Sequence, residues 1–425
     1  MEIKSLQSGL SLKRTVDGGT DAQREAVRKI LQDVAAEGDR ALIRYTEKFD
    51  QVALSSLKVT KEEIEESLER LPEGMIKIME EAAGNIRSYH EKQKQNSWVD
   101  LAASGTMLGQ KRTPLDSVGI YVPGGTAAYP SSVLMNAIPA HVAGVERIVM
   151  VSPPGKDGKL PASVLAAASI AGVTDIYKVG GAQAIGALAY GTETIAKVDK
   201  ITGPGNIYVA LAKREVYGDV DIDMIAGPSE IAVLADETAD ARYVAADLLS
   251  QAEHDARACS VLVTTSRELA EQVKAEVEMQ LESLPRKEIA ASAWEEFGGI
   301  YVAETMEEAV AAINELSPEH LEIQTKDAMN VTGAIKHAGA IFIGAYSSEP
   351  VGDYFAGPNH VLPTNGTARF SSPLNVDDFQ KKTSLIMYSK EDMERNAAKI
   401  AAFARLEGLE AHARAVEARL KEESE

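Results

Sequence analysis

The sequence predicts an α/β fold with two lobes, a helical region at the N-terminus and a helical arm at the C-terminus. Three observations support this prediction. Apolar residues recur at helical spacing over residues 20–95, short β-branched runs alternate with alanine-rich helical segments from about residue 113, and a Ser-capped helical segment begins near residue 389. Alternating strands and helices are typical of βαβ units on a parallel sheet.

The predicted boundaries follow the changes in this pattern. We expect an N-terminal helical region that packs with the second lobe at residues 1–112, and a first α/β lobe at 113–236. The second α/β lobe takes residues 237–375, with strands in SVLVTTS, GGIYVAE and AIFIGAY, and the helical arm takes 376–425.

The composition narrows the class of protein. The chain has 44 basic and 64 acidic residues, and its formal charge of −20 disfavours a nucleic acid or an anionic membrane as a partner. We expect neither a signal peptide nor a membrane span, because no apolar segment is long enough. With Cys259 as its one cysteine, the chain forms no intramolecular disulfide and suits a reducing, cytoplasmic environment.

Four glycine-rich turns mark the expected ligand edge of the first lobe, because ligands of such sheets sit at the carboxyl ends of strands. The turns are VPGG (122–125), VGGAQ (179–183), TGPGN (202–206) and AGPSE (226–230). TGPGN lacks the third glycine of the G-x-G-x-x-G dinucleotide fingerprint, since Tyr208 stands at that position. The turns therefore either hold a cofactor phosphate at helix N-termini or merely reverse the chain.

Any metal site has to use histidine, carboxylate or amide ligands, because the chain has one cysteine. Gln251 and His254 lie three residues apart in a helical segment and form a candidate ligand pair, although a solvated helix face explains the same spacing. The segment VGDYFAGPNHVLPTNG (351–366) contains Asp353 and His360 and indicates a binding loop more than a spacer. His412, in the tail, is by default a surface histidine.

The segment LSPEHLEI places Glu319 and His320 just after Pro318, where a helix is expected to end and a strand to begin. Neighbouring residues of an extended segment point to opposite faces, so we do not expect these two side chains to bond each other. At a corner both can still reach one cavity and transfer separate protons. Cys259 is a candidate nucleophile toward an aldehyde, but free cysteine is more often a small buried hydrophobe.

Eight ordered segments, from about residue 20 to 420, together resemble bacterial members of the histidinol dehydrogenase family: GIYVPGG, GGAQAIGALAYGT, KITGPGNIYV, IDMIAGPSEIAVLAD, DLLSQAEHD, LSPEHLEI, VGDYFAGPNHVLPT and EGLEAHARAVEAR. The resemblance implies two Rossmann-like lobes without the glycine fingerprint, in a homodimer that exchanges elements. It also implies the final steps of histidine biosynthesis, in which L-histidinol is oxidised through histidinal to L-histidine in two NAD-dependent hydride transfers.

The resemblance further implies roles for individual residues, with NAD on the first lobe and the metal and acid–base residues on the second. The acid–base pair corresponds to Glu319 and His320. A zinc ion corresponds to the ligands Gln251, His254, Asp353 and His412, the last reaching the partner's site. Substrate contacts correspond to Ser229, Gln251, His254, His320, Asp353, His360, Glu407 and His412, and NAD contacts correspond to Tyr121, Gln183 and Asn206.

Two alternatives stay open at this point. Relatives on the same scaffold oxidise other small alcohols such as sulfonated diols, but a sulfonate needs cations, whereas Glu407 and His360 suit an imidazole and an ammonium group. A non-catalytic metal- or nucleotide-binding protein would lack Glu319, His320 or a metal ligand, and none is missing. Manganese or cobalt also fits a nitrogen and oxygen ligand set.

Overall fold

The computed structural model describes residues 1–6, 18–124 and 128–420, so Gly125 of the first predicted glycine turn lies outside the described residues. The chain divides into two compact units. Unit 1 comprises Met1–Gln93 and Leu115–Phe379, and unit 2 comprises Lys94–Pro114 and Gln380–Glu425. Both parallel sheets belong to unit 1. Within the described part of the chain, every helix is too short or too polar to cross a bilayer.

The first sheet of unit 1 has five parallel strands in the order β6-β5-β4-β7-β8, so the order reverses between β4 and β7. One face packs against α5 and α6 and the other against α7 and α8, which buries β4 and most of β5 on both sides. The elements are β4 (Ser117–Tyr121), α5 (Pro130–Ala143), β5 (Arg147–Ser152), α6 (Ala162–Ala171), β6 (Asp175–Lys178), α7 (Gly181–Tyr190), β7 (Lys200–Thr202), α8 (Ile207–Val216) and β8 (Asp221–Ile222).

Four N-terminal helices complete the two helical layers of this first lobe: α1 (Asp21–Glu37), α2 (Asp39–Asp50), α3 (Lys61–Glu69) and α4 (Met75–Glu91). The apolar stripe of α1, from Val27 to Val34, joins the core of α7 and α8, while α3 and α4 contact α6 and α5. The predicted packing of residues 1–112 with the second lobe is therefore wrong for the helices, whose apolar faces cover the first lobe. Strand β1 (Ile3–Ser5) instead pairs with the second sheet.

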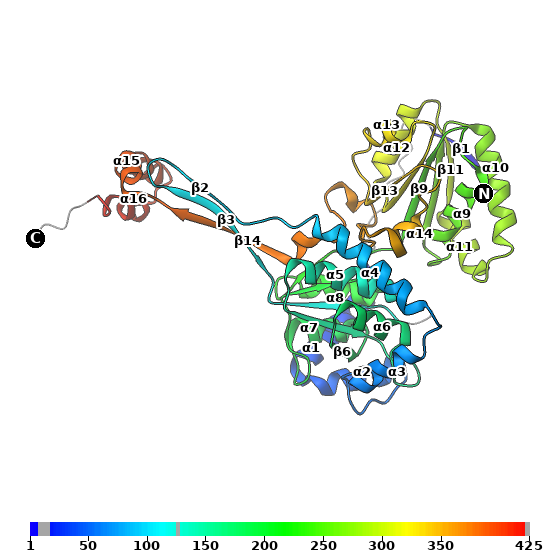
Figure 1. The fold of residues 1–425 in the computed structure, drawn as a ribbon, viewed down its shortest axis with the longest axis horizontal. Coiled ribbons are helices and arrows are strands. Elements are labelled where there is room, and N and C mark those ends of the chain that lie inside the picture. Colours follow the sequence, from blue (N-terminus) through cyan, green and yellow to red (C-terminus); the bar gives the residue numbers. More distant parts are fainter. Residues whose placement is uncertain (7–17, 125–127, 421–425) are drawn as a thin grey trace, which may run out of the picture. The chain divides into compact units, whose positions relative to one another are not determined.

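The second sheet has six parallel strands in the order β1-β11-β10-β9-β12-β13 (Figure 1). Because β9 pairs with β10 and β12, this lobe begins between Ile222 and Glu230, earlier than the predicted boundary at 236/237. Its elements are β9 (Glu230–Ala235), α9 (Ala241–Ala252), β10 (Cys259–Thr264), α10 (Arg267–Leu281), α11 (Lys287–Phe297), β11 (Gly299–Val302), α12 (Met306–Leu316), β12 (His320–Gln324), α13 (Ala328–Thr332), β13 (Ala340–Ile343), α14 (Glu349–Val351), the π-helix Gly352–Ala356 and the 3-10 turns Thr367–Arg369 and Val376–Phe379.

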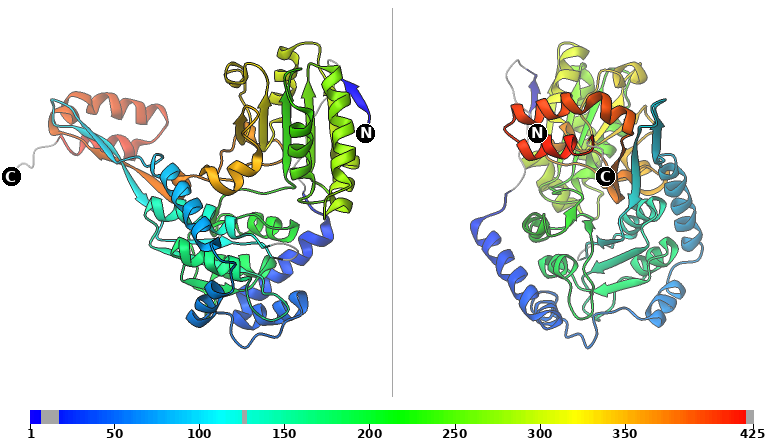
Figure 2. Two further views of the ribbon diagram at one scale, coloured as in Figure 1. Left: turned by 45° about the vertical axis from the view of Figure 1, so that its right-hand side comes forward. Right: turned by 90° about the vertical axis from the view of Figure 1, so that its left-hand side faces the viewer.

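Unit 2 consists of a three-stranded antiparallel sheet, ordered β14-β3-β2, and two helices that lie side by side (Figure 2). Its elements are β2 (Trp98–Leu101), β3 (Met107–Pro114), β14 (Gln380–Met387), α15 (Lys390–Leu406) and α16 (Glu410–Glu417). The predicted helical arm at 376–425 is corrected in two ways. Its first residues, Val376–Phe379, form a 3-10 turn of unit 1, and they are followed by strand β14, which pairs with residues 107–114 of β3. The predicted Ser cap and the break at Gly408, where φ is +77°, are confirmed.

Unit 2 buries little apolar surface of its own. The buried apolar side chains of α15 and α16 are alanines, at positions 397, 401 and 413. In contrast, large apolar side chains stand in solvent, among them Trp98, Leu101, Ile386, Phe403 and Leu406, which are between 54% and 81% exposed. Exposed apolar surface of this extent is typical of an association surface.

Candidate active site

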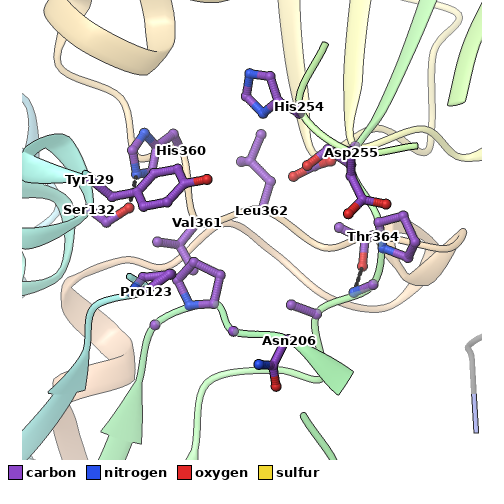
Figure 3. Close-up of a pocket in the computed structure, with 18 of the residues that line it drawn as sticks. Pro123, Tyr129, Ser132, Asn206, His254, Asp255, His360, Val361, Leu362 and Thr364 are labelled. Atoms are coloured by element: carbon purple, nitrogen blue, oxygen red, sulfur yellow. Dashed lines mark hydrogen bonds between the residues drawn. The ribbon is translucent and has the colours of Figure 1, made fainter. Parts of the chain in front are cut away.

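A cavity of about 610 Å³ lies between the two lobes of unit 1 (Figure 3). From the first lobe it is lined by residues that follow the carboxyl ends of β4 and β7, as the sequence predicts. From the second lobe, however, it is lined by Ser229, Glu319 and His320, which lie at the amino ends of β9 and β12. The second sheet thus faces this cavity with the amino ends of its strands, unlike the first sheet.

Nine of the predicted site residues line this cavity. In Figure 3, His254 and His360 lie on one side of the pocket and Asn206 on the opposite side. The structure thus gathers residues that are more than two hundred positions apart in the chain. The nine are Tyr121, Asn206, Ser229, Gln251, His254, Glu319, His320, Asp353 and His360.

His320 opens β12 and is buried. Its Nδ1 lies 3.0 Å from the backbone carbonyl oxygen of Glu230. A carbonyl only accepts hydrogen bonds, so Nδ1 carries the proton and Nε2 of the neutral ring presents its lone pair. This Nε2 is buried, has no hydrogen-bond partner in the described residues, and lies 3.6 Å from Oδ1 of Asp353.

The neighbouring carboxylates govern the charge of His320. Burial by itself acts to lower the pKa of His320, but the negative charges of Glu319 and Asp353 outweigh it and raise this pKa to about 10. In the protein without a metal ion, the imidazole is therefore driven toward its protonated form.

Glu319 immediately precedes β12, and a backbone N–H group of the adjacent strand β9 holds its side chain in place. Its Oε2 accepts a hydrogen bond of 2.9 Å from the backbone N–H of Glu230. Burial raises the pKa of Glu319 to about 8. Its carboxylate lies 3.7 Å from Nδ1 of His320, whose proton is already donated to Glu230, so the two side chains do not share a hydrogen bond. Glu230 thus orients both residues.

Two residues suited to binding a metal ion, Gln251 and His254, lie at or just after the C-terminal end of α9. Gln251 is fully buried, and neither its amide nitrogen nor its amide oxygen has a hydrogen-bond partner in the described residues. An unsatisfied buried polar atom costs about 1–3 kcal/mol, so this amide is arranged for a group that the protein alone does not supply. The C-terminal end of a helix also favours a cation.

His254 follows one turn later and reaches the same cavity. The cavity walls desolvate its ring and lower its pKa, although the residue stays accessible to solvent, so the imidazole is neutral and able to bind a metal. Across the cavity, ligand atoms of His320, Glu349 and Asp353 lie within 4.8 Å of one another. Amide, imidazole and carboxylate donors fit a zinc ion with nitrogen and oxygen ligands.

Asp353 stands in the π-helix Gly352–Ala356, a rare form that is frequent at functional sites. Burial acts to raise its pKa, but contact with His320 and the charge of that ring when protonated outweigh this and lower the pKa of Asp353 to about 2. Burial raises the pKa of the neighbouring Glu349 to about 8. At neutral pH Glu349 is therefore protonated, whereas Asp353 carries the negative charge.

His360 joins the two lobes beside the cavity. Its Nδ1 donates to the backbone carbonyl oxygen of Asp353 at 3.1 Å, and its Nε2 lies 3.4 Å from the hydroxyl oxygen of Ser132 in α5 (Figure 3). Burial lowers the pKa of His360, which keeps the ring neutral. A neutral ring with Nε2 as its acceptor suits a substrate that donates a hydrogen bond.

A second cavity, of about 980 Å³, lies at the carboxyl edge of the first sheet. The three predicted NAD contacts, Tyr121, Gln183 and Asn206, all line it, and Tyr121 and Asn206 line the first cavity as well. Gln183 is buried and its amide oxygen has no hydrogen-bond partner in the described residues. Gly203, at φ +109°, brings the turn against the carbonyl of Tyr121, where a Cβ would clash.

The remaining predicted residues lie elsewhere. Glu407 ends α15 and His412 stands in α16, so both belong to unit 2, and their approach to a cavity stays a prediction. Cys259 lines neither cavity. Its thiol is buried in an apolar cluster and donates to the carbonyl oxygen of Phe297 at 3.2 Å, as expected for a small core residue.

Some residues of the site were not predicted from the sequence. Glu230 and Glu349 were missed, as were Asp247, Glu322 and Gln324, which lie behind the cavity. The segment HLEIQ did indicate Glu322, because a charged residue two positions after His320 must lie on the same face of a buried strand. No pattern in the sequence marks Glu349.

Comparison with known proteins shows the family to which the chain belongs. The family model described as "Histidinol dehydrogenase" matches residues 13–420. Over the full length of both chains, the protein is 66% identical to the histidinol dehydrogenase of Bacillus licheniformis. It is also 66% identical to that of Bacillus subtilis, over 99% of each chain.

A solved structure agrees as well. The crystal structure of histidinol dehydrogenase from Elizabethkingia anophelis superposes with a TM-score of 0.92 at 41% identity, covering 96% of this chain and 94% of that chain. Together with a cavity that gathers a buried histidine, paired carboxylates and an unsatisfied amide, these matches show that the chain belongs to the histidinol dehydrogenase family of oxidoreductases.

Proposed function

We propose that the protein oxidises L-histidinol to L-histidine, through histidinal, in two NAD-dependent hydride transfers at the cavity that contains His320. One observation supports this most directly. A single cavity holds a buried imidazole nitrogen, Nε2 of His320, and a buried amide, that of Gln251, and neither has a hydrogen-bond partner in the described residues. The first suits a base and the second suits a ligand to a metal ion.

Gln251, His254 and Asp353 would hold the metal ion, with His412 from a second subunit as the fourth ligand. When bound, zinc supplies positive charge that anchors the imidazole and amine of the substrate and offsets the charge of Asp353, which lowers the proton affinity of His320. Ser229 and His360 line the same cavity and would orient the substrate from its other sides.

His320 would take the hydroxyl proton as the C–H bond of the alcohol breaks. Its Nδ1–H bond to Glu230 holds the ring so that Nε2 meets the substrate. A base in this position contributes about 10²- to 10⁴-fold in rate. Glu319 would then activate water that adds to histidinal, before the second hydride leaves. The two residues serve separate proton transfers, in agreement with the absence of a bond between them.

The larger cavity would hold NAD through Tyr121, Gln183 and Asn206. The nicotinamide ring supplies the hydride acceptor when bound. Because the two cavities share Tyr121 and Asn206, one extended ligand that fills the larger cavity reaches the smaller one. Asn206 uses its side-chain oxygen to cap α8, which leaves its amide hydrogens for a ligand.

We further propose a homodimer in which unit 2 of each subunit associates with the partner. The exposed apolar side chains of unit 2 need such a cover. Glu407 and His412 would then complete the partner's cavity, with Glu407 accepting from the substrate and His412 binding the metal.

A sulfonated diol is the alternative substrate. The cavity contains two cationic side chains, Arg257 and Arg286, that suit a sulfonate group.

One assay tests the proposal. The protein is incubated with NAD and L-histidinol, and NADH is followed at 340 nm, with and without a chelator. We expect two NADH per histidinol, loss of activity on chelation and recovery with added zinc. A sulfonated diol serves as the comparison substrate. Activity on the diol alone, or equal activity after complete removal of metal, would contradict the proposal.

A further inference from the structure

Strand β12 carries a row of polar side chains where a parallel sheet normally buries apolar ones. His320, Glu322 and Gln324 alternate along the strand and so share one face, while Leu321 and Ile323 take the opposite face in an apolar cluster. Glu322 is 1% exposed and Gln324 is 5% exposed. Burying polar groups in this way is costly unless each is satisfied, and the proposed chemistry uses neither residue.

Glu322 contacts the segment that carries Asp353. Its Oε1 accepts a hydrogen bond of 2.8 Å from the backbone N–H of Glu349, the first residue of α14. Helix α14 runs directly into the π-helix that contains Asp353. The carboxylate of Glu322 therefore fixes the N-terminal end of this segment against β12, two residues from His320.

The other oxygen of Glu322 is linked through Gln324 to the helix that carries Gln251. Its Oε2 accepts 3.0 Å from the side-chain nitrogen of Gln324, which also donates 2.8 Å to Oδ2 of Asp247 in α9. Asp247 lies one helical turn before Gln251 on the same face of α9.

These contacts make Glu322 the common point of three elements that are independent in sequence: α9 with Gln251, β12 with His320, and α14 with the segment of Asp353. We propose that Glu322 is a positioning residue that sets the spacing between the metal ligands Gln251 and Asp353 and the base His320. This inference rests on the proposed function of the cavity, and Glu322 itself does not line that cavity. Supporting residues of this kind commonly tune metal affinity about 10- to 100-fold.

The test compares variants of the full-length protein by calorimetric titration of the metal-free form with Zn²⁺, and by urea unfolding. Glu322→Leu keeps an apolar group of similar bulk but loses both acceptors, and we expect its Zn²⁺ affinity to fall about 10- to 100-fold. Glu322→Gln keeps an acceptor for the N–H of Glu349 but replaces the acceptor for Gln324 with an NH2 group. We therefore expect its Zn²⁺ affinity to lie between those of the parent and of Glu322→Leu.

Ile323→Ala is the matched control, because it removes apolar packing from the opposite face of the same strand. We expect this variant to lose stability and to keep its Zn²⁺ affinity. If Glu322→Leu fails to fold, Gln324→Leu replaces it, since it breaks the link to α9 and keeps the carboxylate of Glu322. Unchanged Zn²⁺ affinity in the folded variant, or an equal loss in Ile323→Ala, would overturn the positioning role.

The design separates this inference from the proposed function. If the parent binds Zn²⁺ and oxidises histidinol while Glu322→Leu matches it in affinity, the positioning role alone fails. If the parent binds no Zn²⁺ at all, the proposed metal site fails and the positioning role falls with it.

Discussion

Nδ1 of His320 lies 3.0 Å from the backbone carbonyl oxygen of Glu230, and this contact leaves Nε2 facing the cavity. The carbonyl cannot donate, so the hydrogen bond selects one tautomer of the ring. The proposed base is thus prepared by a backbone atom of the adjacent strand, β9, and a change of any side chain at position 230 would leave that acceptor in place.

Replacing the base should affect turnover more than binding. We expect His320→Asn to lower kcat about 10²- to 10⁴-fold with little change in KM, because the substrate is anchored mainly by other residues. Steady-state kinetics with L-histidinol measure this, and circular dichroism checks the fold. A rise in KM with unchanged kcat would show that His320 binds substrate without transferring its proton.

Replacing Gln251 should separate stability from metal binding. The buried amide of Gln251 has no partner in the described residues, so Gln251→Met should raise the unfolding free energy of the metal-free protein by about 1–3 kcal/mol. The same change should weaken Zn²⁺ binding at least about tenfold. Urea unfolding in a chelator and calorimetric titration provide the two values. A variant that is less stable and binds Zn²⁺ as before would show that the amide has a structural role.

Cys259 should be dispensable. It is buried away from both cavities, and a serine hydroxyl can donate to Phe297 as the thiol does. We expect Cys259→Ser to keep most of its activity. A loss beyond about a hundredfold, or about 2.7 kcal/mol of barrier, would instead favour a covalent thiohemiacetal mechanism.

Asp50 should make stability depend on pH. Burial raises its pKa from 3.8 to about 6, so between these values the folded protein binds more protons than the unfolded chain. The Asp50 contribution to stability is therefore lost as pH rises from about 4 to about 6, and the penalty persists above that range. We expect Asp50→Asn to be more stable than the parent at pH 7.5 and no more stable near pH 4. Urea unfolding without NAD measures this, since Asp50 lines the larger cavity.

Hybrid dimers test the shared metal site. If His412 serves the partner's cavity, His412→Asn and His254→Asn are each inactive alone, but one cavity in a mixed dimer keeps all its ligands. We expect mixing, with subunit exchange, to restore up to about half of the parent activity per hybrid dimer, since sites that do not contact each other act independently. Each variant mixed with itself is the control. No recovery in hybrids verified by mass spectrometry would place His412 in its own subunit's site.

Local patterns in the sequence predicted several elements well. Pro318 correctly indicated the corner between α12, which ends at Leu316, and β12, which begins at His320. The spacing of Gln251 and His254 predicted that both share one side of a helical segment, and both line the cavity, while Ser389 correctly marked the start of α15. Each of these features depends on a few neighbouring residues, so a short segment contains the necessary information.

Features that depend on distant contacts were harder to predict. The apolar stripe of α1 does not indicate whether the helix covers the first or the second lobe, because the helices of both lobes present apolar faces. The use of the amino ends of β9 and β12 follows from how two sheets face one cavity. The contact between Glu322 and Glu349 joins two segments that carry no mutual signature.

His320 is the first residue of β12. There it pairs with Ile231 of β9 on one side and with Ala340 of β13 on the other. The proposed base, fixed within the ladder of a parallel sheet, cannot easily be retuned by small backbone adjustments, whereas the segment around Asp353 and His360 is not part of any sheet. Efforts to redirect this scaffold toward new alcohols should therefore vary residues 351–366 other than the proposed metal ligand Asp353, and leave the strand sequence HLEIQ untouched.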